Sequence, residues 1–184
     1  MLGHLIFIMF GTHSMRRLIF FLSICFFGAS LATAKPLQEK FDKAAFYSVM
    51  KSGDMAAIEN EMELVKALPA KEQTGYEGAL LMKKADLLKR PKERLKYFKQ
   101  GRIKLETALM NDDDNIEFHF LRLAIEEHAP RIVKYRADIP KDKELVIKNF
   151  KDLPPAVQHA ILDYCSRSKV LHKEDFSLRS KESF

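Results

Sequence analysis

Helical periodicity runs through nearly the whole chain after residue 36, and this feature most limits what the chain can fold into. Apolar residues recur three and four positions apart, as on one face of an α-helix, and no segment alternates as a β-strand does. Residues that end or begin helices interrupt the pattern at Ser52-Gly53, Pro69, Pro91, Pro130 and Pro154-Pro155. The sequence therefore predicts an all-α domain of six or seven helices.

The predicted helices cover about residues 37–51, 54–68, 72–89, 91–110, 115–128, 141–150 and 154–168. The acidic run 112–114 is predicted to cap the helix that follows it, because carboxylates favour a helix N-terminus. The alternative is a calcium-binding loop, but the run lacks the alternating acidic residues and the glycine of such loops. Residues 35–168 form the predicted domain, and residues 169–184 a polar tail.

The predicted helix 91–110 is amphipathic. Its apolar face holds Leu95, Phe98, Leu105 and Leu109. Gly101 and Ala108 lie beside that face, where we expect a neighbouring backbone to approach closely. The opposite face carries Lys92, Lys96 and Lys99.

The predicted helix 115–128 is apolar over more than half of its circumference. The apolar residues are Ile116, Phe118, Phe120, Leu121, Leu123, Ala124 and Ile125. A helix apolar over so wide an arc packs on two sides. The polar stripe that remains consists of His119, Arg122 and Glu126, and we interpret it as solvated, with an Arg122–Glu126 ion pair. An acid–base role for His119 and Arg122 is the alternative.

The stretch 105–115 (LETALMNDDDN) resembles the end of a tetratricopeptide repeat and the turn into the next repeat. Ala108 falls at the small packing position of that repeat, and Asp113 stands where the family usually has proline. Gly78-Ala79 corresponds to the small residues of the repeat's first helix. The resemblance covers about residues 75–128. It implies antiparallel helical hairpins in a short stack and no particular ligand.

Residues 1–34 have the pattern of an export signal. Arg16-Arg17 is followed by the apolar run 18–29, and Ala32-Thr33-Ala34 forms a small-x-small cleavage site. We expect Met15 to be the true start, because a signal usually begins directly before its positive residues. The apolar run is shorter than the roughly 20 residues of a membrane-spanning helix. Cleavage is therefore expected, and a retained signal anchor is the alternative.

The expected mature protein, residues 35–184, is periplasmic or secreted, with no transmembrane span after cleavage. Only Cys165 remains in it, so no internal disulfide forms. The lack of disulfides and of Asn-x-Ser/Thr sites favours a bacterial envelope. Two positive charges and no acidic residue lie in 1–34, so the net charge falls from +6 for the chain to +4. This charge and the expected location exclude nucleic acid as a partner.

Charge is densest between Lys83 and Lys104, where ten basic residues stand against two acidic ones. A solvated helix face explains this segment, and an anionic partner is the alternative. Lys92, Lys96 and Lys99 are the candidate interaction face.

The sequence holds no recognisable catalytic or metal-binding pattern, and we expect neither a cofactor nor a metal. The histidines after cleavage (His119, His128, His159, His172) show no ligand spacing. We therefore predict a non-catalytic module of the cell envelope that binds a protein or peptide. The alternatives are a peripheral binder of an anionic surface through its lysines, and a small exported enzyme that uses His119.

Overall fold

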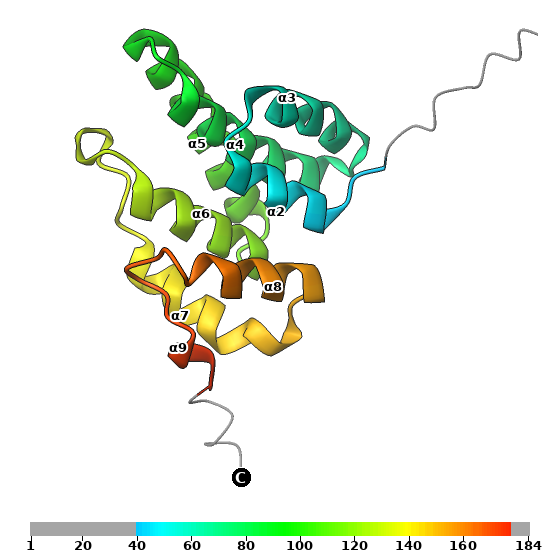
Figure 1. Ribbon diagram of the computed structural model, residues 1–184, viewed down its shortest axis with the longest axis vertical. Coiled ribbons are helices and arrows are strands. Elements are labelled where there is room, and N and C mark those ends of the chain that lie inside the picture. The colour runs from blue at the N-terminus through cyan, green and yellow to red at the C-terminus, as the bar shows by residue number, and fades with distance from the viewer. Residues whose placement is uncertain (1–39, 178–184) are drawn as a thin grey trace, which may run out of the picture. The chain divides into compact units, whose positions relative to one another are not determined.

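A computed structural model describes residues 40–177, which are all-helical (Figure 1). The predicted signal 1–34, with the expected start at Met15, lies outside these residues. The elements are α2 (Lys43–Ser52), α3 (Met55–Leu64), η1 (Val65–Ala67), α4 (Ala70–Leu87), α5 (Pro91–Asn111), α6 (Ile116–His128), η2 (Arg131–Val133), α7 (Ile139–Asn149), η3 (Phe150–Asp152), α8 (Pro155–Tyr164) and α9 (Glu174–Ser177). No strand occurs within residues 40–177, so the predicted all-α class is confirmed. None of the helices described there combines the length and apolar composition of a membrane crossing.

Local signals place most helix ends. Gly53 follows α2 with φ 69°, a left-handed conformation that glycine adopts without strain. Asp54 then caps α3 by accepting the backbone N–H of Ala56 at 2.9 Å. The predicted cap at 112–114 is wrong, because Asn115 caps α6 and accepts the N–H of Phe118 at 3.1 Å.

The helices α4 and α5 form a close antiparallel hairpin (Figure 1). A Cβ atom added to Gly78 would lie 2.6 Å from the backbone nitrogen of Leu105, and one added to Gly101 would lie 2.6 Å from the carbonyl oxygen of Gly78. These distances are too short for any side chain, so the two glycines allow the backbones to touch. The predicted close approach at Gly101 is confirmed, and Gly78 is its partner.

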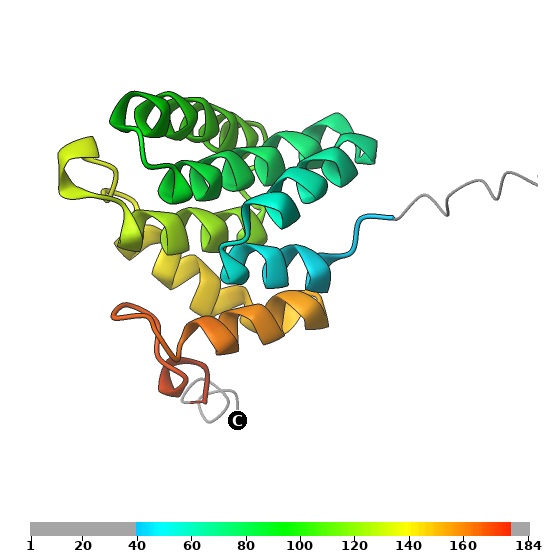
Figure 2. The ribbon, with the colours of Figure 1, turned by 45° about the horizontal axis from the view of Figure 1, so that its top comes forward.

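The helix α6 lies between the helices α2–α5 and the helices α7 and α8 (Figure 2), and it packs against a hydrophobic cluster on each side. Phe118 and Leu121 belong to the cluster formed with α2, α3, α4 and α5. Phe120 and Leu123 belong to the cluster formed with α7, α8 and the segment that follows α8. The expectation that this helix packs on two sides is confirmed, and α6 ties the helices of residues 40–177 together.

The chain beyond residue 168 contributes to the second cluster. Leu171 is fully buried, and Phe176 packs against the same cluster. Cys165 is buried nearby, and burial raises the pKa of its thiol. The packed domain thus continues to at least Ser177, past the predicted boundary at residue 168.

Candidate interaction groove

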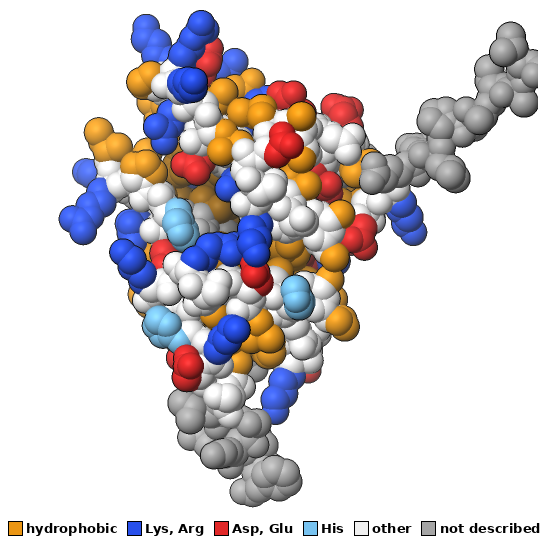
Figure 3. Space-filling view, in the orientation of Figure 1, with side chains coloured by type: hydrophobic (Ala, Val, Ile, Leu, Met, Phe, Trp, Pro, Cys, Tyr) orange, Lys and Arg blue, Asp and Glu red, His pale blue; other side chains and the backbone are white. Residues whose placement is uncertain are grey.

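A large groove of about 1280 Å³ opens between the α4–α5 hairpin and the helices α2, α6 and α8. Figure 3 shows the hollow, with hydrophobic side chains inside it and Lys and Arg side chains around it. The segment after α6 bounds one side, where the ring of Tyr135 lies edge-on against Phe98 at 5.7 Å. The guanidinium of Arg102 lies 4.7 Å from the centre of the same ring. These contacts hold the loop that follows α6 against α5.

Each surrounding helix offers the groove one face at helical spacing. The helix α5 contributes Pro91, Arg94, Leu95, Phe98, Lys99 and Arg102. The helix α6 contributes Phe120, Leu121, Ala124, Ile125 and His128, and α2 contributes Ala44, Tyr47, Ser48 and Lys51. Positions three and four apart share a helix face, so each helix turns one face toward the groove.

The apolar face predicted for α5 is buried along only half of its length. Leu105 and Leu109, in the C-terminal half, belong to the core. Leu95, in the N-terminal half, is 45% exposed and lines the groove, as does Ile132 at 88%. Large hydrophobic residues gathered in one depression mark a binding surface more often than single exposed residues do.

The three lysines of the candidate interaction face differ in their relation to the groove. Lys99 lines the groove beside Phe98, whereas Lys92 and Lys96 are exposed outside it. Positions 92, 96 and 99 are four and three apart, so the three lysines share one side of α5, and Lys99 stands where that side borders the groove.

Cationic side chains surround the groove, and only some have a partner. Lys51 on α2 and Arg167 beyond α8 both pair with Asp163, at 2.9 and 3.1 Å. Within residues 40–177, Lys83 and Lys99 form no ion pair, and Arg102 contacts an aromatic ring instead of a carboxylate. Arg94 on α5 pairs with Asp86 on α4 at 3.9 Å. Six cationic side chains thus line the groove against the two carboxylates of Asp86 and Asp163, which leaves a net positive charge.

The interpretation of His119, Arg122 and Glu126 as a solvated stripe is wrong. His119 and Glu126 are fully buried, and Arg122 is 6% exposed. They face α7, whose Asp142 is also fully buried and supplies the partner charge. The predicted ion pair between Arg122 and Glu126 does not form.

Arg122 binds Asp142 through two parallel hydrogen bonds. Its Nε and Nη2 donate to the two carboxylate oxygens at 2.8 and 2.7 Å, and its Nη1 donates to Glu106 at 2.9 Å. Burial alone would raise the pKa of Asp142, but the hydrogen bonds from Arg122 and His119 lower it. Such a buried bidentate pair fixes how α7 lies on α6.

Both ring nitrogens of His119 are occupied. Nδ1 lies 2.7 Å from Oδ1 of Asp142, and Nε2 lies 2.8 Å from the carbonyl oxygen of Asp113. The ring is fully buried, so neither nitrogen reaches a ligand. The cluster joins three parts of the chain, reaches solvent only at its edge near Glu106, and contributes no residue to the groove lining.

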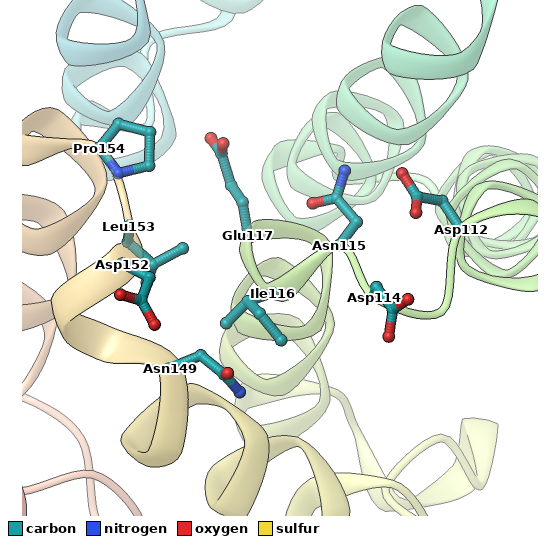
Figure 4. Close-up of a pocket in the computed structure, with 9 residues that line it drawn as sticks. All are labelled: Asp112, Asp114, Asn115, Ile116, Glu117, Asn149, Asp152, Leu153 and Pro154. Atoms are coloured by element: carbon teal, nitrogen blue, oxygen red, sulfur yellow. The ribbon is translucent and has the colours of Figure 1, made fainter.

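A second, smaller pocket of about 460 Å³ lies between the α5–α6 turn and η3 (Figure 4). Its carboxylates come from Asp112 and Asp114 on one side and Asp152 on the other, with Glu117 between them. Asp112 pairs with Lys71 at 3.2 Å, and Glu117 pairs with Lys43. Among residues 40–177 no group of three or more His, Cys, Asp or Glu side chains is arranged to hold a metal ion.

Sequence reasoning missed Arg102 and the apolar walls from α2 and α8. The one residue in the sequence that could have indicated the groove is Leu95. It lies on the apolar face of α5 but outside the core, and an apolar face that extends beyond the core predicts a binding partner. The groove can hold an elongated apolar body with negative charge at its edge. No protein-family model, curated protein or solved structure matches this chain.

Proposed function

We propose that this protein is an exported, non-catalytic module of the cell envelope that binds a segment of a partner polypeptide in its groove. The observation that carries the proposal is the groove itself. Its volume of about 1280 Å³ exceeds the roughly 300–1000 Å³ of most small-molecule sites. Antiparallel hairpins in a short tetratricopeptide-like stack would present such a concave surface. A groove of this kind suits a stretch of chain.

Site-specific photo-crosslinking in the native envelope tests this proposal. A photoreactive amino acid at Leu95 would face the groove, and one at Ile103, on the same helix, would not. Both side chains are exposed, at 45% and 66%, so exposure alone does not favour Leu95. We expect a discrete protein adduct from Leu95 and none from Ile103. Equal adducts from both positions, or adducts with lipid only, would contradict the proposal.

Export is tested separately. The N-terminus of the protein recovered from the envelope is expected at Lys35, after the small-x-small site. An intact N-terminal segment in a membrane fraction would show a retained anchor instead.

The second candidate is a peripheral binder of an anionic surface. The basic segment 83–104 favours it, and its exposed Lys92 and Lys96 are free to meet such a surface. Each exposed lysine would contribute on the order of 1 kcal/mol near an anionic membrane. Reversal of both to Glu, or high salt, would then abolish binding to anionic vesicles. Binding that survives both treatments would exclude this candidate.

A further inference from the structure

We propose that the groove binds an acidic amphipathic α-helix of about three turns. This inference rests on the proposed function, and it adds the conformation, length and charge of the bound segment. Three observations carry it. The helix faces that line the groove indicate the conformation, the length of the α5 face indicates the length, and the cationic side chains indicate the charge.

The conformation follows from the lining helices. The residues that line the groove from α2, α5 and α6 recur three and four positions apart on each helix. In a helix bundle, such faces surround another helix. Here the position that they surround holds no helix of residues 40–177. Small residues at Ala44 and Ala124 leave room for a helix backbone, and Met50 and Met82 adapt to its side chains.

The length follows from α5. Its groove-lining face runs from Pro91 to Arg102, which at 1.5 Å per residue is about 16 Å. A bound helix of about 11 or 12 residues would match it. Leu95 and Phe98 would meet the apolar face of that helix near its middle.

The charge follows from the unpaired cations. Lys83, Lys99 and Arg102 face the groove without a carboxylate partner in residues 40–177. Lys99 and Arg102 lie one turn apart on α5, so carboxylates one turn apart on a facing helix would reach both. A basic helix would be repelled at the same positions.

Two capped synthetic peptides of about 14 residues provide the probes. Both have Leu at i, i+3, i+4 and i+7; one has Glu and the other Lys at the remaining positions. Isothermal titration against residues 35–184 is expected to show binding of the Glu peptide and at least tenfold weaker binding of the Lys peptide. Equal affinities would overturn the acidic specificity.

Charge reversal on α5 gives a matched comparison. The double variant Lys99→Glu with Arg102→Glu should weaken binding of the Glu peptide on the order of tenfold at low salt. The double variant Lys92→Glu with Lys96→Glu changes the same charge on the same helix, outside the groove, and should shift affinity less than threefold. Equal losses in both would overturn the inference. Thermal melts check that both variants fold. If the Lys99→Glu, Arg102→Glu variant does not fold, the double variant Lys99→Gln with Arg102→Gln takes its place.

Groove occlusion separates the two proposals. Ala44 and Ala45 are exposed neighbours on α2, and only Ala44 lines the groove. Suppose that Ala44→Trp blocks peptide binding, Ala45→Trp does not, and charge reversal has no effect. The preference for an acidic helix is then refuted, whereas the proposed polypeptide binding in the groove is retained. If neither peptide binds and Leu95 gives no protein adduct, both fail. If only anionic phosphatidylglycerol vesicles bind, the groove is not a helix site.

Discussion

Substitution of Glu126 by Gln tests the buried cluster between α6 and α7. One carboxylate oxygen of Glu126 accepts the backbone N–H of Asp138 at 3.1 Å, and the other has no hydrogen-bond partner. Burial raises the pKa of this carboxyl group from 4.5 to about 7, and repulsion by Asp138 adds to the effect. Arg122 opposes the shift and Asp142 reinforces it.

The sign and size of the effect follow from linkage. Between pH 4.5 and about 7 the folded state holds the proton of Glu126 and the unfolded state releases it. The stability from this proton is therefore complete below pH 4.5 and is lost as pH rises through about 7. The difference in pKa corresponds to about 3 kcal/mol. Glutamine matches the protonated acid in shape and does not titrate, so we expect Glu126→Gln to exceed the wild type in stability by up to about 3 kcal/mol at pH 8.

Urea unfolding followed by circular dichroism measures the free energy of unfolding of the wild type and of Glu126→Gln, at about pH 4.5 and pH 8. The neighbouring Glu127 is the matched control, because the pKa of its carboxyl group is shifted in the opposite direction. Burial would raise its pKa, but hydrogen bonds from Ser168, Tyr164 and Lys169 lower it. Glu127→Gln should therefore destabilise the protein at neutral pH, and the loss should shrink as pH falls below the ordinary value for Glu. A gain in Glu126→Gln that does not change with pH would refute the reasoning.

Three further substitutions test packing and pairing. Gly78→Ala should destabilise the protein by about 1–3 kcal/mol, because its Cβ would meet backbone, whereas Gln100→Ala on the exposed side of α5 should change little. Leu171→Ala should cost about 2–5 kcal/mol in urea unfolding, against almost nothing for the exposed Ile132→Ala. Asp142→Ala should cost about 3–5 kcal/mol, since it leaves the buried guanidinium without its main partner; a loss below 1 kcal/mol would show that the pair is replaceable.

The sequence predicted those parts of the fold whose signals are local. Gly53 with Asp54 ends one helix and begins the next, and Pro91 opens α5, as their chemistry requires. The wide apolar arc around Phe120 indicated a helix packed on two sides, because the arc is a property of one helix alone.

The buried cluster escaped prediction because its partners lie far apart in the sequence. Arg122 is separated from Asp142 by 20 positions and from Glu106 by 16. The helical pattern shows only which residues share a face, so it pairs Arg122 with Glu126 on the same helix. Which side of α6 would meet α7 depends on the tertiary arrangement, and that side decides whether a polar stripe is solvated or buried.

The helix α5 contributes both to the core and to the proposed binding groove. Its apolar face was predicted as one continuous surface, yet Leu105 lies in the core and Leu95 lies in the groove. A stable fold does not require an apolar residue at position 95, because solvent reaches it. Leucine at position 95, with Lys99 and Arg102 on the same side, instead fits a surface that is completed by a partner. The fully buried residues of this face thus lie beyond Gly101, where the α5 backbone approaches α4, Phe98 before it packs against the core from the groove side, and Leu95 is left for the proposed partner.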